Sequence, residues 1–295
     1  MKRFDFVFGA TAVVLLVAAS PVHIAQAACA NSSGIPDWAR DYAAHRPIDV
    51  PAAIDGAQAV CARAEFDRHL RADIGAVIGY KVALTSQAMQ RRFNTDRPVW
   101  GRLYAGSLSG SGVAKGVAYG THPRFEADLM VRVRDEAINQ ATTPDEVLAQ
   151  LESVIPFIEL PDLLVTSPQH LTAHQLTAVN AGARAGVTGH PIAVPASSAG
   201  RHALQVGLRE MRVTMRDGHG KVLSEGRGSD MLGGHPLLAV PWLAQALARE
   251  GERLRPGDLI SLGSFSPLMK PEPGLRIRVS YEGLPDAQPV TVTFE

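Results

Sequence analysis

The chain has 295 residues, which is enough for one large domain or for a domain with a small appendage. Its 29 basic residues are matched by 29 acidic ones and form no basic block, and this balance argues against nucleic acid as a partner. An apolar fraction of 46% is ordinary for a folded protein.

The N-terminus predicts a secretory signal peptide over residues 1–27. Lys2 and Arg3 precede an apolar run over residues 6–19, and small residues at 25 and 27 form a cleavage pattern after Ala27. An apolar run of this length is too short to span a bilayer comfortably, which disfavours the alternative of a retained membrane anchor. We therefore expect an exported, periplasmic protein that has no membrane contact after cleavage.

Both cysteines of the chain, Cys29 and Cys61, fall in the mature protein. In an oxidising compartment such a pair favours a disulfide, which would tie the new N-terminus to the first helix. The alternative is two free thiols, one of them buried.

The mature chain is predicted to contain many strands and few helices. Residues 51–70 predict an amphipathic helix with Pro51 near its start. We therefore expect an N-terminal arm and helix over residues 28–75 and a main domain over residues 76–295. Apolar or alternating runs in the main domain predict strands over residues 76–86, 98–103, 124–133, 155–162, 208–216, 222–226, 259–263, 275–281 and 290–294. Helices are predicted over residues 87–93, 144–154, 172–178 and 238–250. This pattern indicates an α+β protein built on a mixed, rolled β-sheet.

Four of the charged residues inside the predicted strands are candidates for a functional site. Glu126 and Asp128 are two apart, so their carboxylates share one face of a strand and repel each other unless they are solvated, protonated or joined by a cation. Glu159 and Lys81 each interrupt an apolar run and need a partner of opposite charge. The alternatives are a solvent-facing edge strand for the acids and an ammonium that reaches water for Lys81. Three convergent carboxylates favour a site for a hard cation such as Mg²⁺.

Five stretches of the sequence, in their order and spacing, carry a family resemblance. They are GYKVALTS at 79–86, PRFEAD at 123–128, PFIELPD at 156–162, MLGGHP at 231–236 and RPGD at 255–258. On these motifs the chain resembles the 2-keto-4-pentenoate hydratase and 4-oxalocrotonate decarboxylase family, within the fumarylacetoacetate hydrolase superfamily. The resemblance runs from about residue 49 to the end and makes 76–295 a hydratase/decarboxylase-like catalytic domain.

The resemblance implies a mixed β-sheet roll or sandwich with peripheral helices, like the C-terminal domain of fumarylacetoacetate hydrolases. It implies Mg²⁺ or Mn²⁺ held by Glu126, Asp128 and Glu159, with Asp128 standing where a second Glu is usual. Lys81 would be the catalytic and substrate-orienting residue, and Asn180 would also bind the substrate, a small 2-oxo acid. Ser264 is a further candidate for substrate binding, although it stands where the family usually has an Ala/Gly-rich strand end. The family further implies a homo-oligomer.

The sequence departs from the hydratase pattern at several residues. Val99 stands where the hydratases have an acid that serves proton transfer, and Val179 replaces the acid before Asn180. The expected function is a metal-dependent lyase, a hydratase or decarboxylase, acting on a 2-oxo or 2-hydroxydienoate acid through an enolate. One alternative is a C–C bond hydrolase, for which His122 is the candidate general base. The other is a non-catalytic exported protein that binds an oxo acid.

Overall fold

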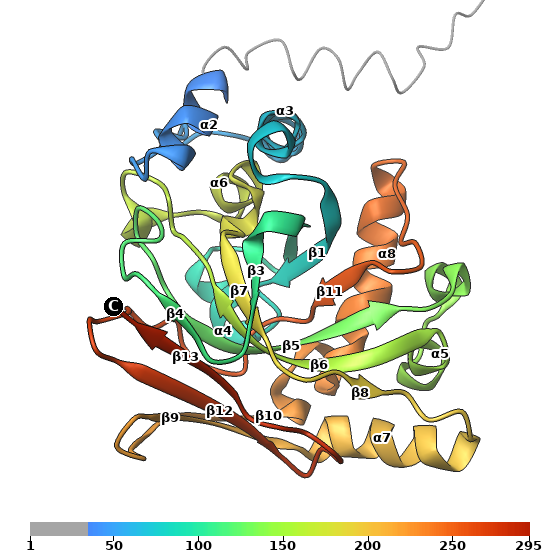
Figure 1. Ribbon diagram of the computed structural model, residues 1–295. Helices are drawn as coiled ribbons and strands as arrows, with labels where there is room; N and C mark the ends of the chain where they lie inside the picture. The colour runs from blue at the N-terminus through green and yellow to red at the C-terminus, as the bar shows by residue number, and fades with distance from the viewer. Residues whose placement is uncertain (1–34) are drawn as a thin grey trace, which may run out of the picture.

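The computed structural model describes residues 35–295, and Figure 1 shows how they are arranged. The predicted signal peptide and Cys29 lie outside the described residues. Within the described part, no helix has the length and apolar character needed to cross a membrane.

Two N-terminal helices lie over one end of the molecule, at the top of Figure 1. They are α2 (Ile35–Ala43) and α3 (Gly56–Ile74). The predicted start of α3 at Pro51 is wrong by several residues, because Asp55 and Gln58 form a capping box that begins the helix at Gly56. Apolar residues of α2, α3 and α6 (Ala173–Ala178) form one hydrophobic cluster, which joins these helices to the main domain.

The main sheet has eight strands and strong curl, and it contains the candidate site. Its order is β2-β1-β11-β5-β6-β7-β3, with β8 paired to β6. The strands are β1 (Val77–Ala83), β2 (Val99–Tyr104), β3 (Leu108–Gly110), β5 (Glu126–Val133), β6 (Leu151–Leu160), β7 (Ala185–Thr188), β8 (Ile192–Ala193) and β11 (Leu259–Ser261). The pairs β1–β11 and β3–β7 are parallel and the others are antiparallel, which confirms the predicted α+β fold on a mixed, rolled sheet.

A second sheet of five strands packs beneath the first, in the lower part of Figure 1. Its order is β10-β9-β12-β13-β4. The strands are β4 (Val113–Lys115), β9 (Arg212–Asp217), β10 (Val222–Arg227), β12 (Arg276–Glu282) and β13 (Val290–Phe294). The Tyr281 hydroxyl of β12 donates to the Asp128 carbonyl at 2.5 Å and accepts from the Phe157 amide at 3.0 Å, and these bonds lock the second sheet onto β5 and β6.

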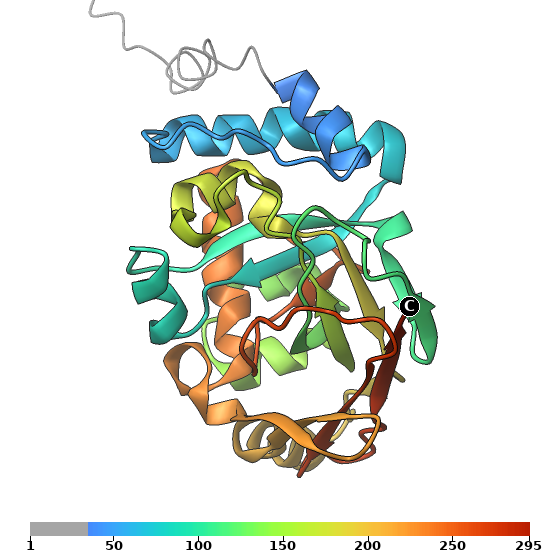
Figure 2. The ribbon, with the colours of Figure 1, turned by 90° about the vertical axis from the view of Figure 1, so that its left-hand side faces the viewer.

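The remaining helices cover the flanks of the two sheets, as the turned view in Figure 2 also shows. They are α4 (Gln87–Arg92), α5 (Pro144–Ala149), α7 (Ser198–Glu210) and α8 (Ala239–Arg249). Short 3-10 turns occur at Ala105–Ser107, Glu136–Gln140, Pro168–His170, Asn180–Gly182, Gly228–Asp230, Leu232–Gly234 and Pro236–Leu238. The strand predicted from residue 208 is wrong at its start, because Ser197 caps a helix whose Leu204 and Leu208 face the core at helical spacing.

Candidate functional site

The four charged residues come together on adjacent central strands of the main sheet. Glu126 of β5 lies directly opposite Glu159 of β6, so their side chains leave the sheet on the same face. Lys81 of β1 is separated from β5 by β11 alone. Glu126 is 7% exposed, Glu159 1%, Asp128 0% and Lys81 3%. The alternatives of a solvent-facing edge strand and of a lysine tip in water are therefore wrong.

The buried ammonium of Lys81 forms an ion pair with a carboxylate. Its Nζ lies 2.6 Å from Glu159 Oε1, and both side chains are almost fully buried. The second oxygen of Glu159, Oε2, is also buried and has no hydrogen-bond partner within the described chain. One lysine thus faces three buried acids, and an acceptor oxygen remains unsatisfied.

Burial and, after it, the negative charge of Glu159 raise the pKa values of the two acids of β5. The pKa of Glu126 lies well above its ordinary value, first because burial disfavours the carboxylate and then because Glu159 is negatively charged. The same two causes raise the pKa of Asp128 to about 7. A pair of acids that resists ionisation in this way needs either protons or an added cation.

Asp128 is held differently from Glu126. Its Oδ1 accepts hydrogen bonds from the Leu129 amide at 2.5 Å and the Gly263 amide at 3.1 Å, and its Oδ2 accepts from Ser261 Oγ at 2.6 Å. Two of these donors, Ser261 and Gly263, belong to β11 and the residues just after it, so they hold the Asp128 carboxylate against that strand. The place of Asp128 in a ligand set stays a prediction.

The fit of a divalent cation rests on Glu126 and Glu159. Over residues 35–295, no group of three or more His, Cys, Asp or Glu side chains is placed so that it could hold a metal ion as it stands. Two opposed carboxylates with one unsatisfied buried oxygen nevertheless match Mg²⁺, which commonly uses one or two carboxylates and completes its shell with water and substrate. The residues present fit such an ion.

A small cavity of about 70 Å³ opens beside these residues. Its charged lining residues are Lys81 and Glu126, and the hydroxyl groups of its lining belong to Thr85, Ser86, Ser264 and Ser266. The apolar residues of the wall are Val82, Ala83, Leu84, Met89, Phe93, Pro161, Leu163, Leu176, Ala181 and Leu268. The arrangement suits a small molecule with an anionic end and an apolar end.

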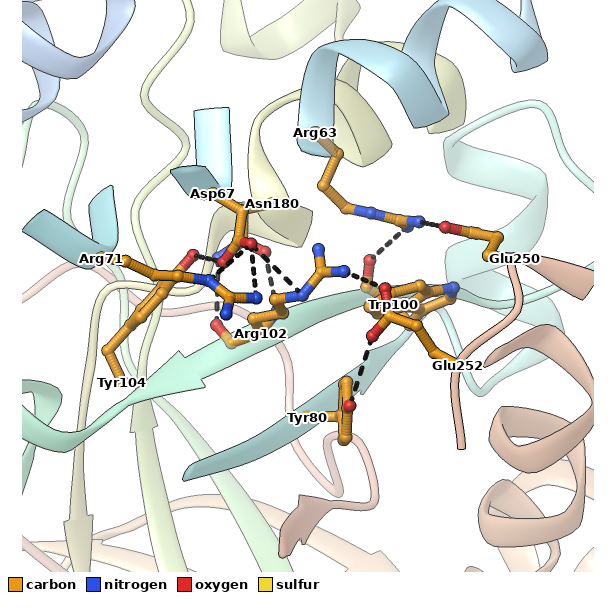
Figure 3. Close-up of polar contacts among 10 residues, drawn as sticks. All are labelled: Arg63, Asp67, Arg71, Tyr80, Trp100, Arg102, Tyr104, Asn180, Glu250 and Glu252. Carbon is orange, nitrogen blue, oxygen red and sulfur yellow. Dashed lines mark hydrogen bonds and ion pairs between the residues drawn. The ribbon is translucent and has the colours of Figure 1, made fainter. Parts of the chain in front are cut away.

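Asn180 is not among the residues that line the cavity, and its role in substrate binding stays a prediction. The cavity is lined by its neighbour Ala181, whereas the Asn180 side chain accepts from the Arg102 amide at 2.7 Å and donates to the Arg102 carbonyl at 3.0 Å. These two bonds, drawn in Figure 3, satisfy the outer edge of β2. Asn180 and Ala181 both have positive φ, 58° and 54°, a strained conformation for residues other than glycine. Asn180 is therefore placed to hold Ala181 in the cavity wall.

Gly101 makes this contact possible. A Cβ at Gly101 would lie 2.2 Å from the Asn180 carbonyl oxygen, so only glycine lets the turn approach β2. Gly101 pairs with Lys81 in the register of β1 and β2, which brings the turn next to the buried lysine. The sequence indicated a segment of small residues rich in glycine here. It did not indicate that this segment would form hydrogen bonds with the edge of β2.

The three other residues considered in the sequence analysis, Ser264, Val99 and His122, differ in whether they line the cavity. Ser264 lines the cavity, but its Oγ bonds to the Ser266 carbonyl at 2.6 Å. Val99 begins β2 and packs in the apolar cluster of the N-terminal helices rather than lining the cavity. His122 is also outside the lining, and its Nε2 is buried without a hydrogen-bond partner in the described residues.

A buried ionic network, shown in Figure 3, fastens α3 to β2 and was missed by the sequence analysis. Arg63 bonds Glu250 and stacks 3.5 Å above the Trp100 ring, and Arg102 bonds Glu252. Asp67 accepts from the Tyr104 hydroxyl at 2.8 Å and from Arg71 at 2.8 Å. The spacing of Arg63, Asp67 and Arg71, four residues apart along one helix face, was the signal available in the sequence.

The fold defines the class of this protein. It resembles the 4-oxalocrotonate decarboxylase of Pseudomonas putida G7, with a TM-score of 0.77 and 24% identity over 92% of this chain and 98% of that one. It also resembles the fumarylpyruvate hydrolase of Pseudomonas aeruginosa, with a TM-score of 0.53 and 16% identity over 73% of this chain and 88% of that one. The fold is that of the fumarylacetoacetate hydrolase superfamily.

Sequence comparison defines the family within this class. The 2-keto-4-pentenoate hydratase of Burkholderia vietnamiensis is 30% identical over 195 residues, which cover 65% of this chain and 70% of the relative. A 4-oxalocrotonate decarboxylase of Pseudomonas putida is 28% identical over 208 residues, covering 70% and 75%. No family model matches the chain. The chain belongs to the 2-keto-4-pentenoate hydratase and 4-oxalocrotonate decarboxylase family.

Proposed function

We propose that this protein is a metal-dependent lyase of the hydratase type that acts on a 2-oxo or 2-hydroxydienoate carboxylic acid. The observation that carries the proposal is the buried Glu126–Glu159 pair with its unsatisfied oxygen, beside Lys81 at the charged end of a cavity. Hydratases and decarboxylases are both among the relatives, so decarboxylation is the other reaction that this site would serve.

Glu126 and Glu159 would hold Mg²⁺ or Mn²⁺, with Asp128 as a further ligand or as their support. The decarboxylase relative is described in complex with magnesium and adipate, and the hydrolase relative with Mn²⁺ and pyruvate. The ion would act as a Lewis acid toward the oxygens of a 2-oxo acid.

Lys81 has two tasks in this proposal. Its ammonium holds Glu159 at 2.6 Å and fixes the direction of that carboxylate. It also lines the cavity, where it can pair with the substrate carboxylate or give a proton to an enol oxygen. Lys81 and Glu126 are the titratable side chains of the cavity lining, so within the described residues we assign proton transfer to Lys81.

A non-catalytic protein that binds oxo acids is the second candidate function. The position of Val99 favours it, because the acid that hydratases use for proton transfer is missing from the sequence. The hydrolase alternative has less support, because His122 lies outside the cavity lining.

An activity assay on the mature protein tests the proposal. Loss of the ultraviolet absorbance of 2-hydroxypenta-2,4-dienoate is followed with Mg²⁺, with Mn²⁺ and with EDTA. We expect turnover only with metal and a loss of at least about 100-fold in Glu126→Gln, the size typical for removal of an electrostatic catalytic group. Glu272→Gln, at an exposed position, is the matched control. Metal-dependent oxalate binding without turnover of any dienoate would favour the binding protein, and full turnover in Glu126→Gln would refute the assignment.

We further propose that the chain is exported and works as a homo-oligomer. Cys61 is disulfide-bonded, and structural disulfides belong to oxidising compartments. Mass spectrometry of a periplasmic extract should find a chain that begins at Ala28, and light scattering should give a mass that is a multiple of the monomer. A full-length cytoplasmic monomer would contradict both statements.

A further inference from the structure

The turn that follows β1 contains a residue in a strained backbone conformation. Leu84 comes directly after the last residue of β1, and its φ of 60° lies in the left-handed region. That region is rarely adopted by a bulky apolar residue, so the surrounding structure has to hold Leu84 there. Strained residues of this kind cluster at functional sites, and Leu84 lines the cavity together with Lys81.

The side chain of Gln90 holds this strained turn from α4. Its Nε2 donates to the Leu84 carbonyl at 2.9 Å, and its backbone amide donates to the Ser86 carbonyl at 3.0 Å. The Leu84 side chain is buried in the apolar cluster of the N-terminal helices. The conformation of Leu84 is therefore fixed from two sides, by packing at its side chain and by a hydrogen bond at its carbonyl. Gln90 itself does not line the cavity.

The strained turn leads directly to Thr85, whose hydroxyl group is free to bind a ligand. Thr85 is 5% exposed and belongs to the lining of the cavity. Within the described part of the chain its Oγ1 forms no hydrogen bond. Buried polar groups are nearly always hydrogen-bonded in native structures, so an unpaired hydroxyl at a cavity calls for a partner from outside the chain.

Thr85 lies at the acidic end of the cavity. A Cβ at Gly263 would lie 2.2 Å from Thr85 Oγ1, so the hydroxyl sits against Gly263 at a place where only glycine leaves room for it. The Gly263 amide in turn donates to Asp128 Oδ1 at 3.1 Å. Lys81 and Glu126 line the same cavity. The Thr85 hydroxyl is therefore close to the groups that are proposed to hold the metal ion and the substrate carboxylate.

The other hydroxyl groups of the lining are at least partly engaged. Ser264 and Ser266 each donate their proton to a backbone carbonyl, at 2.6 and 3.2 Å. Ser86 Oγ caps α4 by accepting from the Met89 amide at 3.3 Å, although its proton has no acceptor among the described residues. Thr85 thus has the hydroxyl of the lining whose oxygen and proton are both uncommitted in this part of the chain.

We propose that Thr85 binds the substrate by donating its hydroxyl proton to an oxygen of the bound 2-oxo acid, and that Gln90 is the positioning residue for this hydroxyl. The inference rests on the proposed function, because it takes the 2-oxo carboxylate as the ligand. Thr85 supplies a neutral hydrogen bond beside the charge of Lys81. Gln90 acts on the substrate only through the Leu84 carbonyl and Thr85, so a residue outside the lining controls substrate binding.

Calorimetric titration with oxalate in the presence of Mg²⁺ tests the role of Thr85. Thr85→Val keeps the size of the side chain but removes the hydroxyl, and loss of one hydrogen bond to a charged ligand should weaken oxalate binding about tenfold or more. Thr85→Ala should show the same loss, whereas Thr85→Ser keeps the donor and should bind within about threefold of the wild type. Failure of the wild-type protein to bind oxalate would overturn the proposed function and this inference together. Wild-type oxalate affinity in Thr85→Val or Thr85→Ala would overturn the inference alone.

A double-variant cycle tests the role of Gln90. Gln90→Met removes the donor to the Leu84 carbonyl and should weaken oxalate binding about threefold or more, whereas Gln87→Met, at an exposed position of the same helix, should leave it unchanged. In a Thr85→Val background, Gln90→Met should have little further effect, because Gln90 acts through the Thr85 hydroxyl. Additive losses in the double variant, or wild-type affinity in Gln90→Met, would overturn the positioning role of Gln90.

Discussion

Replacement of Lys81 by Met should weaken the fold by an amount that the buried ion pair sets. The change removes the ammonium 2.6 Å from Glu159 Oε1 and leaves two opposed carboxyl groups, Glu126 and Glu159, without a cation. Removal of one partner of a buried pair typically costs about 3–5 kcal/mol of unfolding free energy. In a domain of this size each kcal/mol lowers Tm by about 2–4 °C, so we expect a loss of about 6–20 °C in metal-free buffer.

Differential scanning calorimetry at pH 6 and pH 8 with EDTA measures this loss. The loss should be larger at pH 8, because Glu126, whose pKa is already raised by burial, can take up a proton at pH 6 instead of remaining charged. The double variant Lys81→Met/Glu159→Gln, which removes both charges, should recover much of the stability. Lys221→Met, at an exposed position, is the control and should leave Tm within about 1 °C. An unchanged Tm in Lys81→Met at both pH values would refute the reasoning.

Three further predictions concern the titration, the strained turn and the disulfide. The folded pKa of Asp128 is about 7 and the unfolded value is about 3.9, so the native state holds an extra proton between these two pH values. The metal-free protein should therefore lose up to about 4 kcal/mol of unfolding free energy as the pH rises through this window. Urea titrations in EDTA that showed stability rising there would contradict this prediction. Asn180→Ala leaves the Arg102 amide unpaired and should lower the unfolding free energy by about 1–3 kcal/mol in the same assay. It should also lower kcat/KM more than the exposed control Asn94→Ala does, because Ala181 loses its support. Equal kinetics of the two variants would count against a positioning role for Asn180. Reduction by dithiothreitol of a Cys29–Cys61 bond, which closes a loop of roughly 30 residues, should cost about 4 kcal/mol, and a Tm that dithiothreitol does not move would exclude a stabilising disulfide.

The sequence predicted the central strands well because their signal is local. Alternation over residues 124–133 and a charged residue within each apolar run identify β5, β6 and β1 without knowledge of their neighbours. The helix predicted over residues 144–154 was too long, since α5 ends at Ala149 and β6 begins at Leu151. Apolar residues lie on both sides of this boundary, at Val147 and Leu148 in α5 and at Leu151 in β6, and periodicity over so short a run does not separate a helix end from a strand start.

The parts of the site that the sequence could not give depend on pairing between distant segments. β11 lies between β1 and β5, and only this placement brings Ser261 and the Gly263 amide to the Asp128 carboxylate. In the same way, the role of Asn180 follows from the outer edge of β2, whose amide and carbonyl groups it satisfies. The sequence identified the charged residues of the site, but which of them face one another depends on the order of the strands in the sheet.

Isothermal titration of the mature protein with oxalate, with and without Mg²⁺, tests the central claim most directly. If Glu126 and Glu159 hold a divalent ion at the charged end of the cavity, oxalate should bind only with Mg²⁺, and Glu126→Gln should lower this affinity at least tenfold while Glu272→Gln leaves it unchanged. Oxalate binding that is equally tight without metal, or equally tight in Glu126→Gln, would contradict the account.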